Sequence, residues 1–187
     1  MNIQFVKGRS YAIVGESGCG KSTLAKLIAG LLPYEQGEIN YDDLRVKKIA
    51  LDEYRTMVRY ISQETHLFNT GVKNNVEMGH EAGNYKDFLM ALGMDEILAR
   101  SDVEFEESKD LLSAGQQQRI VLARSLNYLP QVLILDEPTA NMDIETAIQS
   151  LSIFNKLDDL TLIVITHADN NNLLELFDEV IYMEKSR

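Results

Sequence analysis

Residues 15–23 match the pattern G-x-x-x-x-G-K-S/T and read Gly15-Glu16-Ser17-Gly18-Cys19-Gly20-Lys21-Ser22-Thr23. This pattern is typical of a phosphate-binding loop, because its glycines let successive backbone N–H groups converge on a phosphate. The apolar run at residues 11–14 predicts a strand before the loop, and the helical pattern after it adds the positive end of a helix dipole. We expect Lys21 to reach the outer phosphates of a nucleotide and the Ser22 hydroxyl to ligate Mg²⁺. A plain glycine-rich turn is the alternative, and it explains neither flanking element.

Length and charge limit the classes of protein to which the chain can belong. Its 187 residues, 45% of them hydrophobic, suffice for one domain with its own core. The 29 acidic and 18 basic residues give a net charge of −11, which repels a phosphate backbone, so no nucleic acid partner is expected. The single cysteine, Cys19, excludes an internal disulfide and fits a reducing compartment. The apolar runs fall far short of the ~18 residues of a membrane span, so we expect a cytoplasmic chain.

Strand and helix patterns alternate along the sequence. Strands are predicted at residues 3–6, 10–14, 37–41, 58–61, 132–135, 161–165 and 180–183. Helices are predicted at residues 22–31, 51–57, 85–100, 144–157 and 173–177, with a further helix begun by the N-cap Ser113 and stopped by Pro130. This order predicts an α/β fold with a mostly parallel sheet and helices on both faces. We interpret 71–109 as a small α-helical subdomain of a single domain, 1–187, whose core is 1–70 and 110–187.

Polar residues follow four of the predicted strands where those strands end. They are the phosphate loop after residue 14, Gln63 after residue 61, Asp136 and Glu137 after residue 135, and His167 after residue 165. Ligands of parallel sheets bind at the carboxyl ends of the strands. We therefore expect these groups to converge on one site.

The chemistry of these residues suggests a role for each. Asp136 ends an apolar strand, the position from which such proteins hold Mg²⁺ through water. Glu137 is the candidate general base, and we expect Pro138 to force it into an extended conformation. A histidine after a strand is more often a solvated loop residue, but the position of His167 favours contact with the γ-phosphate. Gln63 is a candidate ligand of Mg²⁺ and of the attacking water.

Two further patterns lack a supporting context. His66 and His80 follow no predicted strand, and we interpret them as solvated. The segment Asn155-Lys156-Leu157-Asp158 fits the N-K-x-D pattern of GTPases. It lies on the helix predicted at residues 144–157, whereas the GTPase motif follows a buried strand. Guanine specificity is therefore not expected.

Together these motifs resemble the nucleotide-binding domain of the ATP-binding cassette (ABC) family, a P-loop NTPase of RecA-like fold. Residues 112–116, Leu112-Ser113-Ala114-Gly115-Gln116, are similar to the family signature L-S-G-G-Q, and Asp143 matches the Asp of the family's D-loop at residues 139–143. The resemblance is greatest to the exporter branch, on Tyr54-Arg55, Val58, Ile61, Gln63, Leu67-Phe68 and Asn74-Asn75-Val76.

The resemblance implies a function and a set of partners. The chain would bind ATP and Mg²⁺, with Ser113, Ala114, Gly115 and Gln116 contacting ATP held on a second cassette in a homodimer or heterodimer. Hydrolysis would drive transport, in the export direction, through transmembrane domains at the inner face of the membrane. Two other functions stay open: a nucleotide-gated regulatory module with little turnover, and a soluble ABC ATPase of DNA repair or translation.

The sequence departs from the family pattern at several positions. Ala114 replaces the first signature glycine, which adds a methyl group where backbone approaches phosphate. Gln117 stands where the family usually has Arg or another polar residue. The segment around Glu107 resembles the exporter loop that contacts the membrane domain. Glu106 and Lys109 stand there at positions where the family usually has glycine. The chain also begins beyond the strands where the resemblance implies an adenine-stacking aromatic residue, so we interpret it as a fragment or a minimal cassette.

Overall fold

The computed structural model describes residues 2–64, 66–79, 84–100, 112–167 and 171–185. The chain divides into two compact units. The first comprises Met1–Ser62, Pro130–Glu137 and Asp158–Arg187, and the second comprises Gln63–Leu129 and Pro138–Leu157. The segment 71–109, predicted as a helical subdomain, falls within the second unit. Its boundaries as a subdomain stay a prediction.

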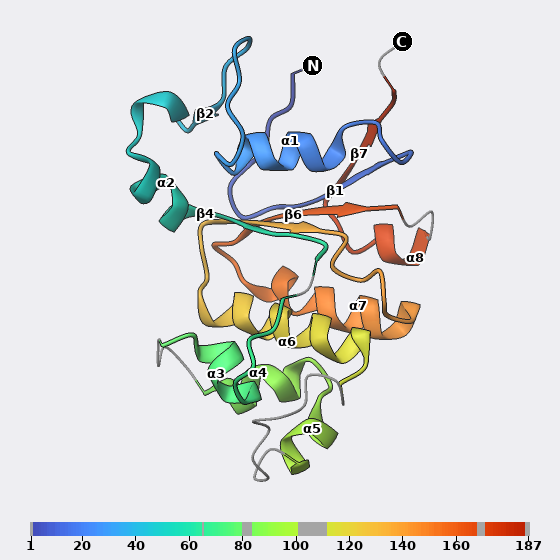
Figure 1. Cartoon of the computed structure of the whole chain (residues 1–187). Helices are drawn as coiled ribbons and strands as arrows, with labels where there is room; N and C mark the ends of the chain where they lie inside the picture. Colours follow the sequence, from blue (N-terminus) through green and yellow to red (C-terminus); the bar gives the residue numbers. More distant parts are fainter. Residues whose placement is uncertain (1, 65, 80–83, 101–111, 168–170, 186–187) are drawn as a thin grey trace. The chain divides into compact units, whose positions relative to one another are not determined.

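The first unit is built on a five-stranded sheet in which every pair of neighbours is parallel (Figure 1). In spatial order the strands are β4 (Val58–Ile61), β5 (Val132–Asp136), β6 (Thr161–Thr166), β1 (Ser10–Gly15) and β7 (Glu179–Met183). Val14 is paired with Thr166, and Asp136 with Ile165. The strands thus end at one edge of the sheet. This parallel sheet, with the helices that accompany it, confirms the predicted α/β fold class.

Two interior strands, β5 and β6, consist almost entirely of β-branched residues and leucine, which favour a buried sheet. Residues Leu133, Ile134 and Leu135 of β5 are all fully buried, as expected of a parallel strand covered on both faces. Helix α1 (Lys21–Ile28) packs on the sheet through Ala25. The cluster on this face consists of Ile13, Ala25, Ala29, Tyr54, Val58, Ile134, Ile163 and Ile165. Each large apolar side chain buried in this way contributes roughly 1.5–3 kcal/mol of transfer free energy.

Short elements complete the first unit. Helix α2 (Leu51–Met57) places Tyr54 in the cluster just described, and the Tyr54 hydroxyl donates to the carbonyl of Ile28 at 2.6 Å. Strands β2 (Asn40–Tyr41) and β3 (Leu44–Arg45) form an antiparallel hairpin. The remaining elements are the 3₁₀ helix η1 (Val46–Lys48) and helix α8 (Asn171–Leu174).

The second unit is helical in the residues that the structure describes. Its helices are α3 (Val72–Glu77), α4 (Tyr85–Ala91), α5 (Asp95–Arg100), α6 (Ala114–Asn127), α7 (Ile144–Ser152) and the 3₁₀ helix η4 (Phe154–Lys156). Helix α6 is tied to the segment before it by Arg124, whose guanidinium donates to the carbonyl of Asn75 at 2.7 Å and to its side-chain oxygen at 3.1 Å. Such forked bonds fix a loop more firmly than a single contact.

Several predicted elements differ in the structure. Residues 3–6 form no strand; instead the Val6 N–H donates to the Tyr11 hydroxyl at 2.7 Å. The helix predicted at 85–100 is split into α4 and α5, because Gly93 adopts a φ of +65° between them. The helix predicted at 144–157 ends at Ser152, and Asn155 and Lys156 lie in η4. His80, Glu106, Glu107 and Lys109 lie outside the described residues.

Candidate phosphate-binding and catalytic site

The backbone between β1 and α1 forms a tight loop that requires glycine at two points. A Cβ atom on Gly15 would collide with the carbonyl oxygen of Met183 in the adjacent strand β7. Gly20, the N-cap of α1, has a φ of +101°, a conformation that other residues rarely adopt. The side chains of Glu16 and Ser17 are exposed. The backbone of these two positions forms the turn that a phosphate-binding loop requires.

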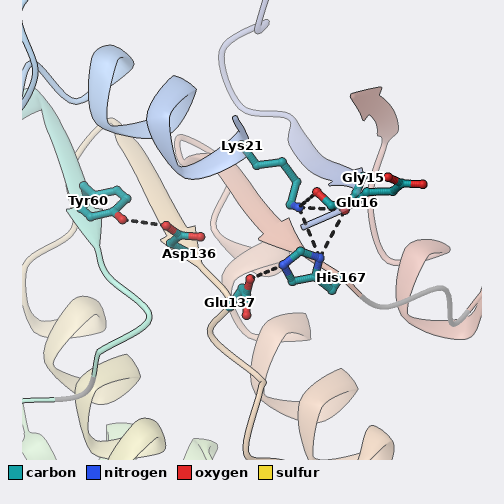
Figure 2. Close-up of polar contacts among 7 residues, drawn as sticks. All are labelled: Gly15, Glu16, Lys21, Tyr60, Asp136, Glu137 and His167. Atoms are coloured by element: carbon teal, nitrogen blue, oxygen red, sulfur yellow. Dashed lines mark hydrogen bonds and ion pairs between the residues drawn. The ribbon is translucent and has the colours of Figure 1, made fainter. Parts of the chain in front are cut away.

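Lys21 is buried, with 4% of its surface exposed, and its ammonium group lies against the loop (Figure 2). Its Nζ atom is 2.7 Å from the carbonyl oxygen of Gly15 and 3.0 Å from that of Glu16. The third contact, at 3.3 Å, is to Nδ1 of His167. These contacts match the three donors of an ammonium group. These hydrogen bonds hold the positive charge of Lys21 beside the phosphate loop.

His167 joins Lys21 to Glu137. Its Nε2 atom lies 2.6 Å from Glu137 Oε1, and its Nδ1 atom faces Lys21 and the Gly15 carbonyl, the latter at 3.2 Å. Because an ammonium only donates, Nδ1 accepts from Lys21 in the neutral ring, and Nε2 carries the hydrogen given to Glu137. In the doubly protonated ring Nδ1 donates to Gly15 instead. In both forms the imidazole holds the Glu137 carboxylate beside the loop.

Glu137 has a φ of +50°, so the prediction that Pro138 forces it into an extended conformation was wrong. Proline disfavours the right-handed helical region at the preceding residue. Glu137 avoids that region by adopting the left-handed conformation in place of the extended one. The Glu137 N–H donates to the Ile165 carbonyl of β6 at 2.9 Å, which extends the ladder one residue beyond β5. A non-glycine residue held at positive φ is strained, and such strain is concentrated at functional sites.

The two oxygens of the Asp136 carboxylate have different surroundings. Asp136 is 4% exposed, and its Oδ2 atom accepts a hydrogen bond from the Tyr60 hydroxyl at 2.7 Å. Its Oδ1 atom is buried and has no hydrogen-bond partner among the described residues. Desolvation and, second, the bond to Asp136 raise the pKa of Tyr60, so the phenol remains a donor. The carboxylate therefore keeps one oxygen for a group that the chain does not supply.

This arrangement fits Mg²⁺. The described residues contain no cluster of three or more His, Cys, Asp or Glu side chains that would hold a metal. In phosphate sites, however, Mg²⁺ is usually held by one or two carboxylates together with water and substrate oxygens. The unpartnered Oδ1 of Asp136 has the chemistry of such a ligand and, as predicted, would act through water. Ser22 lies in the first turn of α1 and is half-buried, at the predicted position.

Two other predicted site residues lie on the surface. Gln63 is exposed and lies two residues after the end of β4, at the start of the second unit. Thr23 is exposed on α1. The structure therefore brings together Lys21, His167 and Glu137, while the ligand roles of Gln63 and Thr23 stay predictions.

The signature segment begins helix α6 in the second unit. The Gln116 N–H donates to Ser113 Oγ at 3.2 Å, and the Ser113 N–H donates to Gln116 Oε1 at 2.9 Å, a reciprocal cap that confirms Ser113 as the N-cap. Ser113 and Ala114 are exposed. A Cβ atom on Gly115 would lie 2.7 Å from the carbonyl oxygen of Asn141 in the D-loop. The signature thus presents Ser113 and Ala114 to solvent and packs Gly115 against the D-loop.

Asp143 serves as the N-cap of α7 in this structure. Its Oδ1 atom accepts from the Thr146 N–H at 2.9 Å and its Oδ2 atom from the Thr146 hydroxyl at 2.7 Å. These hydrogen bonds, to the Thr146 N–H first and to its hydroxyl second, lower the pKa of Asp143. Both oxygens of Asp143 therefore already accept hydrogen bonds from Thr146 in the first turn of α7. The predicted contact of Asp143 with nucleotide stays a prediction.

Sequence reasoning missed Tyr60. The sequence predicts the strand at residues 58–61 and indicates Gln63 as the functional residue after it. The signal lay in the pairing of β4 with β5, in which Tyr60 is opposite Ile134 and therefore diagonal to Asp136. Diagonal neighbours on one face are within reach of a long aromatic side chain. The sequence alone does not fix that pairing register.

Within the described ranges, no helix combines the length and the apolar character needed to cross a bilayer.

Comparisons with known proteins agree with the motifs and the geometry. The ATP-dependent lipid A-core flippase of Escherichia coli (strain K12) is 35% identical over 198 residues, and that of Pectobacterium atrosepticum is 33% identical over 196 residues. The match covers 98% and 100% of this chain, respectively, and 33% of each flippase. Both relatives are named as ATP-dependent flippases.

A solved structure is also similar. The structure of a bacterial Atm1-family ABC exporter with ATP bound has a TM-score of 0.84 at 26% identity, over 96% of this chain and 33% of that one. The chain thus spans about a third of the length of the relatives it matches. The family model described as ABC transporter matches residues 1–140. The solved structure supports the predicted P-loop fold, and the family model covers most of the sequence. The chain therefore belongs to the ABC transporter family.

Proposed function

We propose that this chain binds ATP with Mg²⁺, hydrolyses it, and thereby powers export through membrane-spanning domains. The single observation that carries the proposal is the contact chain from Lys21 through His167 to Glu137 beside the phosphate loop. A phosphate cradle needs only the loop and Lys21. A carboxylate held next to it by an imidazole adds what hydrolysis requires, a base near the terminal phosphate. The names of the relatives, an ATP-dependent flippase and an exporter with ATP bound, support the same activity.

Each residue has a role that follows from its position. The loop N–H groups and the dipole of α1 bind the phosphates, and the Lys21 ammonium exchanges its carbonyl partners for phosphate oxygens. His167 orients the Glu137 carboxylate, which accepts a proton from the attacking water. Ser22, Gln63 and, through water, Asp136 would hold Mg²⁺. Bound there, the ion would neutralise the charge that develops on the phosphate oxygens.

The proposed partners are a second cassette and transmembrane domains. Ser113 and Ala114 are exposed at the N-terminus of a fourteen-residue helix, α6, which suits them to bind an anion presented by another subunit. The D-loop residue Asp143, exposed on the same unit, would face the same partner. We place the assembly at the inner face of the membrane, with the cassettes in the cytoplasm.

A hydrolysis assay tests the proposal. The purified chain should release phosphate from millimolar Mg-ATP, and chelation of Mg²⁺ with EDTA should stop the release. A regulatory module that closes on nucleotide without turnover would bind ATP in the same titration and release none. Binding without Mg²⁺-dependent phosphate release would therefore overturn the proposed activity and favour that module.

His167→Ala should lower the rate of hydrolysis at least tenfold while changing ATP affinity little. The side chain contacts Lys21 and Glu137, so its removal frees the Glu137 carboxylate from the orientation in which it accepts the proton of the attacking water, while the phosphate loop stays intact. Phosphate release and equilibrium binding of ATP are the two measurements. His66→Ala, in which an exposed histidine that contacts Glu64 is removed, is the matched control. An unchanged rate in His167→Ala would leave this histidine a structural role only.

A further inference from the structure

The Tyr60–Asp136 pair sits between two neighbouring strands of the sheet. Tyr60 belongs to β4 and Asp136 ends β5, and the two strands pair over four residues. The Tyr60 ring packs against the buried cluster beneath α1, while its hydroxyl reaches Asp136 Oδ2 at 2.7 Å. The donor is therefore anchored at its ring by packing and on its backbone by the sheet.

The geometry points to Tyr60 as a positioning residue for the metal: by holding Oδ2 of Asp136, its hydroxyl aims the unpartnered Oδ1 at the Mg²⁺ shell (Figure 2). This inference rests on the proposed Mg-ATP site. It adds a residue outside the phosphate loop and outside the acidic pair at residues 136 and 137.

The reason lies in the torsional freedom of a carboxylate. The terminal torsion of an aspartate is broad and roughly two-fold, so an untethered Asp136 exchanges its two oxygens and samples a range of directions. A hydrogen bond to a charged oxygen is strong enough to select one arrangement. Burial strengthens that selection, because water does not compete for Oδ2.

A phenol is also a suitable donor for this purpose. A lysine or an arginine at residue 60 would fix Oδ2 equally well but would neutralise the charge that attracts the ion. The Tyr60 hydroxyl is neutral and supplies a single hydrogen, so the carboxylate keeps its charge and keeps Oδ1 available. Hydrogen-bond partners that orient a carboxylate at a metal site typically change metal affinity by 10–100-fold when they are mutated. We expect the lower end of this range for Tyr60, because Asp136 would reach Mg²⁺ through water.

The test measures how strongly Mg²⁺ improves nucleotide binding, without turnover. A non-hydrolysable ATP analogue is titrated into the chain by calorimetry, once with saturating Mg²⁺ and once with EDTA, and the ratio of the two affinities is the Mg²⁺ enhancement. Tyr60→Phe keeps the ring and its packing and removes the hydroxyl. Tyr182→Phe is the matched control, since Tyr182 is 69% exposed on β7. Asp136→Asn and the double variant complete a cycle.

Tyr60→Phe should lower the Mg²⁺ enhancement about tenfold and leave the affinity in EDTA within twofold of the parent. Tyr182→Phe should match the parent. In the Asp136→Asn background the Tyr60 substitution should have no further effect, because the hydroxyl acts through that carboxylate.

Two results overturn the inference. One is a Mg²⁺ enhancement in Tyr60→Phe that equals or exceeds that of the parent. The other is an equal loss of affinity in Mg²⁺ and in EDTA, which would assign the hydroxyl a structural role. An unchanged enhancement in Asp136→Asn would be a different failure, since it would remove Asp136 from the metal site and with it that part of the proposed function.

Discussion

Glu137→Gln is expected to slow ATP hydrolysis by about 10²- to 10⁴-fold, the usual contribution of a general base. Glutamine has the size of glutamate and accepts a hydrogen bond from His167 through its amide oxygen, but it does not take up a proton at neutral pH. Bound ATP should therefore persist. Single-turnover phosphate release measures the loss. Glu53→Gln, which changes an exposed glutamate on α2, is the control and should retain the parent rate.

The same variant should reveal the association of two cassettes. If hydrolysis reopens an ATP-bound dimer, Glu137→Gln should accumulate that dimer on size exclusion with millimolar Mg-ATP and remain monomeric with ADP. Adding Ser113→Arg should abolish the dimer, because a long side chain replaces an exposed hydroxyl at the start of α6. A Glu137→Gln chain that binds ATP and stays monomeric, or a double variant that dimerises equally well, would contradict the shared site.

Lys21→Ala should lower hydrolysis by about 10²- to 10³-fold and weaken ATP binding as well. Its ammonium supplies charge-assisted hydrogen bonds from a nearly water-free position, and removing one such donor from a developing charge costs a factor of this size. The substitution also leaves the carbonyls of Gly15 and Glu16 without the donor that they share. Phosphate release and calorimetric ATP binding are the measurements.

A second lysine of the same helix provides the control for that experiment. Lys26 lies in the last turn of α1, whereas Lys21 is its first residue. Lys26→Ala therefore removes the same charge from the same helix, away from the phosphate loop. The parent rate is expected for Lys26→Ala. If both variants behave alike, the effect reflects the charge of the helix, and the specific role of Lys21 does not hold.

The parts of the fold that follow local rules were predictable from the sequence. The phosphate loop is defined by its own residue types, and the apolar run before Asp136 is long enough to indicate a buried parallel strand. Three strand ends then sufficed to bring Lys21, Glu137 and His167 together, since parallel strands end at one edge. Because these three residues lie at the same edge of the sheet, His167 can contact both Lys21 and Glu137.

Features that depend on distant partners or on single torsions were not predictable. The helix expected at 85–100 has apolar spacing throughout, and only the positive φ of Gly93 divides it. The strand expected at 3–6 has suitable residues but finds no partner strand in the described structure. Tyr60 acquires its role from the pairing register between β4 and β5, which a run of strand formers does not specify.

Because of the left-handed backbone at Glu137, selection for thermal stability and selection for ATP hydrolysis favour different residues at this position. A side chain at that φ costs about 1–2 kcal/mol relative to glycine, which adopts the conformation freely. Laboratory evolution for heat resistance alone should therefore replace Glu137 with glycine or asparagine, and each replacement would discard the proposed base. Libraries screened for thermal tolerance would then drift towards cassettes that bind ATP firmly and turn it over poorly. Proteins designed on this scaffold by consensus for stability should keep residue 137 fixed.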